Sequence, residues 1–311
     1  MKVVFMGTPD FAVPSLKALI ESGYIVEAVV TQPDKPKGRG YKISYPPVKE
    51  VAISNNIPVL QPEKIKNNYE FYNELKNYNP DVIVVVAYGK ILPKEILELP
   101  RFGCINVHAS LLPKYRGAAP INWAIINGEK QTGITIMYME EKLDAGDIIL
   151  QELVGIEEDD TAGILHDKLA FLGSKLLVKA LGLMESGKAM RIPQKEEEAT
   201  YAPMIDREIT EIKWVKSSKE IVNLIRGLNP FPGAHTYYKD ELIKIWRAAS
   251  VDNADYGKPG EIVELGRDYI LVSCGKGGLK ILELQREGKK KLSAGEFLRG
   301  ISIKVGDFFG T

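Results

Sequence analysis

Short apolar runs alternate with amphipathic stretches through the first half of the chain. The runs are rich in β-branched residues, as at 82–86, which is typical of buried strands in a parallel sheet. The stretches between them carry apolar residues at helical spacing, as from Phe11 to Ile20. The predicted strands cover residues 3–6, 24–30, 57–60, 81–86 and 104–109, and the predicted helices cover residues 11–22, 48–54 and 69–78. This alternation predicts an α/β domain with a doubly wound, mostly parallel sheet, which binds ligands at the carboxyl ends of its strands.

The second half of the chain changes character. Two more strands at 133–140 and 148–154 and a helix at 161–184 complete a predicted first domain at residues 1–187. A polar stretch with Pro193, Pro203 and a run of glutamates predicts a linker at 188–207. The later elements are a helix at 219–227 and short strands at 233–239, 242–248, 260–265, 269–274 and 278–283. Because Gly and Pro divide these strands, we predict a small, OB-like β-barrel domain at residues 208–311.

Composition and charge narrow the class of protein without naming a partner. The 311 residues carry 41 basic and 41 acidic side chains and are 45% hydrophobic, so the whole chain has no charge bias toward nucleic acid. Cys104 and Cys274 lie far apart in predicted strands, which excludes a disulfide framework and a four-ligand zinc site. Met1 leads directly into the first strand, and no apolar run approaches the length of a membrane span. We therefore expect a cytoplasmic protein.

The densest chemistry lies in residues 104–117, where a predicted strand enters a loop broken by Pro113 and Gly117. In a strand, Asn106 and His108 lie side by side on one face, while their apolar neighbours point to the other. An amide can donate to a developing oxyanion, and an imidazole can donate or carry a proton near neutral pH. The alternative is a buried polar pair satisfied by neighbouring backbone. The loop directly after the strand favours a reactive site.

Three other features allow more than one interpretation. Asp144 lies in Leu143-Asp144-Ala145-Gly146-Asp147, a turn-forming sequence between two predicted strands, so a catalytic role and a simple turn residue are equally favoured. His166 lies in the predicted helix at 161–184, where a surface or packed histidine is the simpler interpretation. The turn at 7–10 after the first strand lacks the G-x-G-x-x-G pattern, which excludes a dinucleotide-binding fingerprint.

The run from Asn106 to Gly117 resembles the signature of the folate-dependent formyltransferases, Asn-x-His-x-Ser-Leu-Leu-Pro-x-Tyr-Arg-Gly. Residues 7–12, 199–203 and 229–234 are similar to other motifs of that family, so the resemblance spans nearly the whole chain. It implies formyl transfer from 10-formyltetrahydrofolate without a metal ion, with Asn106, His108 and Asp144 as catalytic residues. The implied folate-binding residues are Phe11, Tyr88, Ile91, Leu92, Ser110, Leu111, Leu112 and Pro113.

A long basic loop between the strand at 24–30 and the helix at 48–54 bears on the acceptor. Its cations stand among glycines and prolines and suit phosphate contacts, although an ordinary surface loop is the plain alternative. We expect this loop to reach away from the sheet without a fixed fold. It is similar to the loop of those family members that formylate methionyl-tRNA, which implies initiator tRNA as partner.

The barrel region is the second candidate for RNA contact. From Asp206 onward it holds 18 basic and 15 acidic residues, a net charge of +3. The candidate RNA-binding residues are Lys35, Lys37, Arg39 and Lys42 in the long loop, and Arg286, Lys289, Lys290 and Lys291 in the barrel. We expect a monomer.

Two other functions stay open at this point. One is a formyltransferase acting on an amino-sugar nucleotide, which predicts no dependence on tRNA. The other is a folate- or RNA-binding module without catalysis, and a turnover assay separates it from both enzymes.

Overall fold

The computed structural model describes residues 1–37, 42–251 and 256–310, and the chain forms two compact units. Unit 1 comprises Met1–Gly117, Thr132–Val154 and His166–Ala202, and unit 2 comprises Ala118–Gln131, Gly155–Leu165 and Pro203–Thr311. Each unit therefore draws on separate stretches of sequence. The domain boundaries at residues 187 and 208 stay a prediction.

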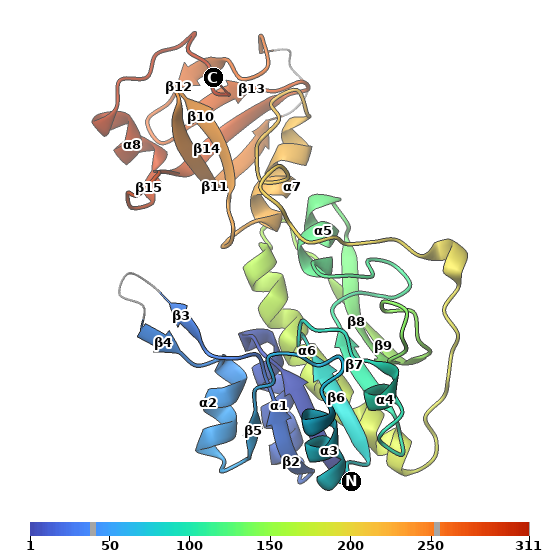
Figure 1. Ribbon diagram of the computed structural model, residues 1–311. Coiled ribbons are helices and arrows are strands. Elements are labelled where there is room, and N and C mark those ends of the chain that lie inside the picture. The colour runs from blue at the N-terminus through green and yellow to red at the C-terminus, as the bar shows by residue number, and fades with distance from the viewer. Residues whose placement is uncertain (38–41, 252–255, 311) are drawn as a thin grey trace. The chain divides into compact units, whose positions relative to one another are not determined.

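Unit 1 is built on a sheet with the strand order β5-β2-β1-β6-β7-β8-β9 (Figure 1). The pairs β1–β2, β1–β6, β2–β5 and β6–β7 are parallel, whereas β7 and β8 are antiparallel. The strands are β1 Lys2–Gly7, β2 Ile25–Val30, β5 Val59–Leu60, β6 Val82–Val86, β7 Cys104–His108, β8 Gln131–Tyr138 and β9 Ile148–Gly155. The predicted doubly wound, mostly parallel sheet is confirmed, and β7 ends at His108, one residue before the predicted end at 109.

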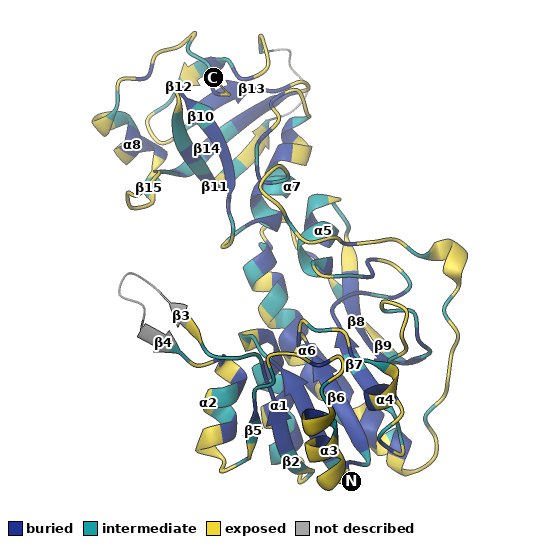
Figure 2. Cartoon of the chain, viewed as in Figure 1, coloured by how far each residue is buried: buried dark blue, intermediate teal, exposed yellow. Residues whose placement is uncertain are grey.

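Helices cover both faces of this sheet. Strand β6 is buried along its whole length (Figure 2). Val4 and Ile83 pack in one apolar cluster with Phe71 of helix α3. On the opposite face, α6 approaches so closely that a methyl group at Gly173 would lie 2.9 Å from Cγ1 of Val107. The helical elements of this half are η1 Asp10–Ala12, α1 Val13–Glu21, α2 Pro47–Ser54, α3 Tyr69–Asn77, α4 Lys94–Leu97, α6 Ala162–Glu185 and η2 Glu196–Glu198.

The long basic loop differs from the prediction, because its described part has a fixed fold. Strands β3 Lys35–Lys37 and β4 Lys42–Ser44 form an antiparallel hairpin in which Lys37 pairs with Lys42. Both strands of an isolated hairpin are edge strands. Proline is tolerated in such a strand because its missing N–H can lie on the side that faces no partner strand, where no backbone hydrogen bond is lost. The expectation of a loop without fixed structure was therefore wrong for these residues.

Polar side chains fix the base of this hairpin. Nζ of Lys49 donates to both carboxylate oxygens of Asp34, at 2.9 and 2.7 Å, and to Oε1 of Gln61 at 2.7 Å. Nε2 of Gln61 in turn donates to Oδ1 of Asp34 at 2.8 Å. These hydrogen bonds, first from Lys49 and then from Gln61, hold the pKa of the Asp34 carboxyl below its ordinary value.

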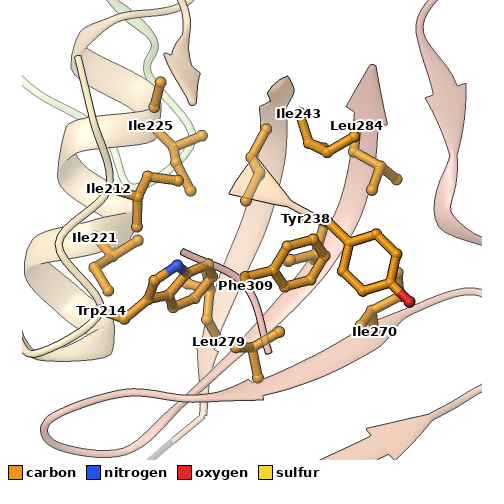
Figure 3. Packing of buried hydrophobic residues seen from close by; sticks show 14 of the residues in the cluster. Ile212, Trp214, Ile221, Ile225, Tyr238, Ile243, Ile270, Leu279, Leu284 and Phe309 are labelled. Atoms are coloured by element: carbon orange, nitrogen blue, oxygen red, sulfur yellow. The ribbon is translucent and has the colours of Figure 1, made fainter. Parts of the chain in front are cut away.

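Unit 2 contains an antiparallel sheet with the strand order β10-β11-β14-β13-β12, and β15 pairs with β14 (Figure 1). Its core is apolar and aromatic, with the rings of Trp214 and Phe309 stacked at 5.8 Å and Tyr238 packed against Phe309 (Figure 3). The elements are α5 Pro120–Ile126, α7 Ser218–Gly227, β10 Ala234–Tyr238, β11 Glu241–Val251, β12 Ile262–Leu265, β13 Ile270–Ser273, β14 Gly278–Arg286, β15 Leu292–Ser293 and α8 Ala294–Gly300. The β-domain that was predicted as a small, OB-like barrel is thus built on an antiparallel sheet.

The carboxyl-terminal segment connects the two outer strands of this sheet. The backbone N–H of Gly306 donates to Ile262 in β12 at 2.8 Å, and the N–H of Ile262 donates to Asp307 at 2.8 Å. On the other side, the N–H of Gly310 donates to the carbonyl of Tyr237 in β10 at 2.8 Å. Residues 306–310 thus occupy the gap between β10 and β12, so that the sheet wraps around its core as a barrel does.

Helices α5 and α7 pack within unit 2 although 105 residues separate Asn122 from Gly227. A methyl group at Gly227 would lie 2.6 Å from Cγ1 of Ile126, and Nδ2 of Asn122 donates to the Gly227 carbonyl at 2.7 Å. Only glycine allows this approach of the two backbones. The contact explains why a segment from the first half of the sequence belongs to unit 2.

Candidate active site

Strand β7 delivers His108 to a buried position with a defined proton arrangement. The residue is 5% exposed, and Nε2 of its ring lies 2.9 Å from the backbone carbonyl oxygen of Tyr115. Because a carbonyl oxygen only accepts, Nε2 carries the hydrogen in this bond. The other ring nitrogen, Nδ1, lies 3.7 Å from Oδ2 of Asp144. That distance is too long for a hydrogen bond and short enough for strong attraction if the ring becomes protonated.

Asp144 reaches this position from the turn between β8 and β9. Its backbone is in the left-handed region, with φ of +47°, which non-glycine residues adopt at an energetic cost of about 1–3 kcal/mol. Its Oδ2 also accepts the backbone N–H of Gly117 at 2.9 Å. A methyl group at Gly146 would lie 2.0 Å from the carbonyl oxygen of Tyr138, so the turn requires glycine there. The carboxylate therefore contacts the signature loop at Gly117 and lies near His108, while its catalytic role stays a prediction.

Asn106 lies two positions before His108 and on the same face of β7. Its residue is partly exposed, and among the described residues its side chain has no hydrogen-bond partner. An amide in this state keeps its N–H groups for a bound molecule. His108 and Asp144 are thus close in space, with 3.7 Å between Nδ1 and Oδ2. Asn106 is placed beside His108 by its position two residues earlier on the same strand.

Hydrogen bonds between side chains and backbone groups hold the loop after β7 in place. Oγ of Ser110 donates to the carbonyl of Lys114 at 2.6 Å, and Oγ1 of Thr135 accepts from the N–H of Leu112 at 3.1 Å. Nε2 of Gln151 donates to the carbonyl of Leu112 at 2.8 Å. Ser110 and Leu112 are buried, while Leu111 and Pro113 are partly exposed. Of the residues expected to bind folate here, Leu111 and Pro113 have side-chain surface to offer, and the other two shape the loop.

The remaining predicted folate residues fall into different environments. Tyr88 and Leu92 are buried, and Ile91 on the same loop is 83% exposed. Burial raises the pKa of the Tyr88 hydroxyl, which has no hydrogen-bond partner among the described residues. Phe11 packs edge-on against the ring of His166 with 5.2 Å between the ring centroids, as expected for a packed helix histidine. The folate assignments of these residues stay predictions.

Sequence reasoning missed several residues that hold the site. They are Arg116, Thr135, Gln151 and Gln194. Arg116 lies inside the signature, and its complete burial is the property that distinguishes it. Thr135, Gln151 and Gln194 carry no signal in the sequence, because each acts on backbone groups of a loop that is distant along the chain.

The predicted RNA contacts of the hairpin are only partly within the described structure. Lys35 is exposed, and its Nζ donates to Oε1 of Gln32 at 3.3 Å. Lys37 and Lys42 face each other in the backbone ladder, and Arg39 lies outside the described residues. A cavity of about 200 Å³ at the hairpin base is lined by Thr8, Gln32, Pro33, Lys35, Ser44, Tyr45 and Pro46.

The basic residues of unit 2 are not equivalent. Nη2 of Arg286 lies 2.7 Å from Oε1 of Glu241, and Lys291 pairs with Glu283. In contrast, Lys289 and Lys290 are exposed and have no carboxylate at ion-pair distance within the part of the chain that the structure describes. These two lysines are the better candidates for contacts to phosphate groups.

Neither a metal centre nor a membrane span is found in the described ranges. Within residues 1–37, 42–251 and 256–310, no group of three or more His, Cys, Asp or Glu side chains could hold a metal ion. Over the same ranges, every helix is too short or too polar to cross a bilayer.

Solved structures share the fold of the whole chain at low sequence identity. HypX from Aquifex aeolicus in complex with tetrahydrofolic acid matches with a TM-score of 0.65 and 20% identity, over 100% of this chain and 51% of that one. An N-formyltransferase from Helicobacter canadensis, in complex with folinic acid and dTDP-3-aminofucose, matches with a TM-score of 0.68 and 22% identity, over 94% of this chain and 100% of the other. At these identities the likeness establishes the fold alone.

Sequence relatives identify the family. The family described as formyl transferase matches residues 1–181, and the family of its C-terminal domain matches residues 204–302. The methionyl-tRNA formyltransferase of Caldanaerobacter subterraneus subsp. tengcongensis is 57% identical over 98% of this chain and 99% of its own length. The methionyl-tRNA formyltransferase of Pelotomaculum thermopropionicum is 56% identical over 100% of this chain and 99% of its own. With both segments matched and full-length relatives at this identity, the chain belongs to the formyl transferase family.

Proposed function

We propose that this protein transfers a formyl group from 10-formyltetrahydrofolate to the α-amino group of methionyl-tRNA, the initiator tRNA of translation. The observation that carries the proposal is the geometry at the end of β7. There the amide of Asn106, which has no hydrogen-bond partner in the part of the chain that the structure describes, lies on the same strand face as a histidine whose Nδ1 is 3.7 Å from a carboxylate oxygen. Full-length relatives that are named methionyl-tRNA formyltransferases support the choice of substrates.

Asn106, His108 and Asp144 have distinct roles in the proposed reaction. The amino nitrogen bonds to the formyl carbon, the bond from that carbon to N10 of the folate breaks, and one proton moves from the amine to N10. Asn106 donates to the formyl oxygen as negative charge develops on it. Nδ1 of His108 accepts the proton of the attacking amine and returns it to the leaving nitrogen. Asp144 stabilises the imidazolium while it exists, and Tyr115 holds the ring in place.

The apolar surface of the signature loop fits a folate co-substrate. Leu111 and Pro113 offer apolar surface next to the reacting side chains, while Thr135 and Gln151 hold the loop backbone still. These side chains would bind and orient the formyl donor. The co-substrate supplies the activated one-carbon unit, and the protein supplies proton transfer and stabilisation of charge.

A second acceptor is worth testing because a structural neighbour binds one. The Helicobacter canadensis N-formyltransferase was solved with an amino-sugar nucleotide. The basic composition of the loop that holds Lys35, Lys37 and Lys42 favours RNA, because lysines suit contacts to the phosphates of an acceptor stem. Monomeric state and cytoplasmic location are part of the proposal and can be measured by sedimentation and cell fractionation.

The decisive experiment supplies 10-formyltetrahydrofolate with each candidate acceptor in turn. Charged initiator methionyl-tRNA, uncharged initiator tRNA and dTDP-3-aminofucose are compared by initial rates of formyl incorporation. We expect incorporation with charged tRNA alone. Transfer to the amino sugar at a higher kcat/KM would replace the acceptor and keep the chemistry, whereas no transfer to any amine would reject the enzyme altogether.

A further inference from the structure

The side chain of Gln194 holds the turn that carries Asp144. Its Nε2 donates to the backbone carbonyls of Asp144, at 2.9 Å, and of Gly146, at 2.8 Å. These two bonds span the turn and use both N–H groups of the amide. Because Asp144 has φ of +47°, its conformation depends on such outside support.

The other end of the same amide is fixed by a buried guanidinium. Oε1 of Gln194 accepts from Nε of Arg116 at 3.2 Å and from Nη2 at 2.9 Å. Arg116 is 0% exposed, and its Nη1 pairs with Oε2 of Glu196 at 2.9 Å. A buried guanidinium is costly without acceptors, so it holds Gln194 in one rotamer. Glu196 is also bound by Lys142 at 2.6 Å, and these two cationic donors, Lys142 first, keep the pKa of its carboxyl low.

The segment at residues 194–202, to which Gln194 and Glu196 belong, also supports His108. Oγ1 of Thr200 accepts from the backbone N–H of Tyr115 at 2.9 Å, and the Thr200 carbonyl accepts from the N–H of Arg116 at 2.9 Å. The N–H of Ala202 completes the pairing by donating to the Arg116 carbonyl at 2.7 Å. Tyr115 has φ of +61°, and its carbonyl is the group that orients His108. The position of the imidazole thus depends on Thr200 as that of the carboxylate depends on Gln194.

We propose that the connector at residues 194–202 is a positioning element of the reaction centre, and that Gln194 sets the distance between the Asp144 carboxylate and the imidazole of His108. The segment lies between the two matched family segments, which end at residue 181 and begin at residue 204. The inference rests on the proposed function, because it assigns Gln194 a role through Asp144. It implies that a stretch expected only to link domains controls the rate of proton transfer.

The experiment separates the two ends of the Gln194 amide. Gln194→Glu keeps oxygen acceptors for Arg116 and removes the donors that hold the Asp144 turn. We expect kcat to fall about 10- to 100-fold, because a displacement on the order of 1 Å has that effect on a positioned group. The KM for 10-formyltetrahydrofolate should stay within about threefold of wild type. Gln194→Met, which removes the acceptor for Arg116 as well as the donors, should lower kcat at least as much. Lys188→Met is the control and should match wild type, because Lys188 is exposed and lies outside residues 194–202.

A double-mutant cycle with Asp144→Asn supplies the readout that a merely structural residue would not move. Asparagine tolerates the left-handed backbone, so it removes the charge with little change in the turn. If Gln194 acts through Asp144, Gln194→Glu should lower kcat less than about twofold in the Asp144→Asn background. Additive losses, or a fall in melting temperature with unchanged kcat, would overturn the inference. If Asp144→Asn itself transfers formyl groups at the wild-type rate, the catalytic assignment fails as well, which distinguishes the two failures.

Discussion

The backbone carbonyl of Tyr115 accepts the N–H of Nε2 in His108 at 2.9 Å, and this bond decides which nitrogen of the ring is reactive. The neutral ring must then carry its lone pair on Nδ1, the atom that lies 3.7 Å from Asp144. We expect nitrogen NMR of histidine-labelled protein to assign the Nε2–H tautomer to neutral His108. A ring protonated on Nδ1 alone would contradict the proposed path of the proton.

Loss of any catalytic side chain should reduce turnover more than binding. Asn106→Ala, His108→Ala and Asp144→Asn should each lower kcat by about 10²-fold or more, because each removes a group that acts on charge in the transition state. Rapid-quench kinetics together with folate titration measure the two quantities separately. The prediction fails for a variant whose affinity for folate collapses while its turnover per bound complex survives.

The long basic loop between β2 and α2 should contribute to acceptor recognition and not to the chemistry. Arg39→Ala should weaken transition-state binding of methionyl-tRNA by about 1–3 kcal/mol, because a guanidinium can pair a phosphate bidentately or stack on a base. Hydrolysis of 10-formyltetrahydrofolate in the absence of tRNA should not change. Lys66→Ala, an exposed residue before α3, is the control. Equal losses in the two variants would indicate a general charge effect instead of a specific contact.

Lys289 and Lys290 should account for more of the salt dependence of RNA binding than Lys291. Each lysine that contacts a phosphate contributes about 0.7–0.9 to the slope of log K against log salt. The double change Lys289→Gln and Lys290→Gln should therefore lower this slope by about 1.5, measured by filter binding over a salt series. Lys291→Gln should have a smaller effect, because Lys291 already pairs with Glu283. A slope that is unchanged in the double variant would exclude this surface from RNA binding.

Unit 2 should lose stability in mild acid through His235. Burial lowers the pKa of this imidazole below its ordinary value of 6.5, so below that pH the unfolded chain binds a proton that the folded chain resists. Its contribution is therefore fully present above about pH 6.5 and decreases as the pH falls toward the folded pKa. Trp123, Trp214 and Trp246 all lie in unit 2, so urea unfolding followed by tryptophan fluorescence reports on it. His235→Asn should flatten this pH dependence, and the same slope in both proteins would point to another group.

The features that could be predicted from the sequence are those encoded locally. The alternation in 104–109 predicts the strand that carries Asn106 and His108, and the turn sequence around Asp144 predicts a loop between two strands. Both were correct because they depend only on side-chain period and turn chemistry. That His108 and Asp144 would meet came only from the family resemblance, since 36 positions separate them in the chain.

The features that sequence reasoning missed depend on distant backbone groups or on edge geometry. Gln194 and Thr135 look like ordinary polar residues until the loops that they hold are in place. The hairpin β3–β4 was taken for irregular loop because Gly and Pro normally end strands, and this rule is weaker in a two-stranded ladder. Nothing in the segment around α5 signals that it packs with α7, because its partner lies far along the chain.

The packing of α5 against α7 also predicts which segments should unfold together. Helix α5 belongs by contacts to unit 2, although in sequence it lies between β7 and β8 of unit 1. A polypeptide segment exchanges its amide hydrogens with the cooperative unit in which it packs, not with its neighbours in sequence. The backbone amides of Trp123 and Ala124 should therefore lose protection from hydrogen exchange together with those of α7. The amides of β7 and β8, which lie on either side in the sequence, should stay protected. A fragment that begins at residue 203 would accordingly not be a natural folding unit, because it would lack helix α5, which precedes it in the sequence and packs in unit 2.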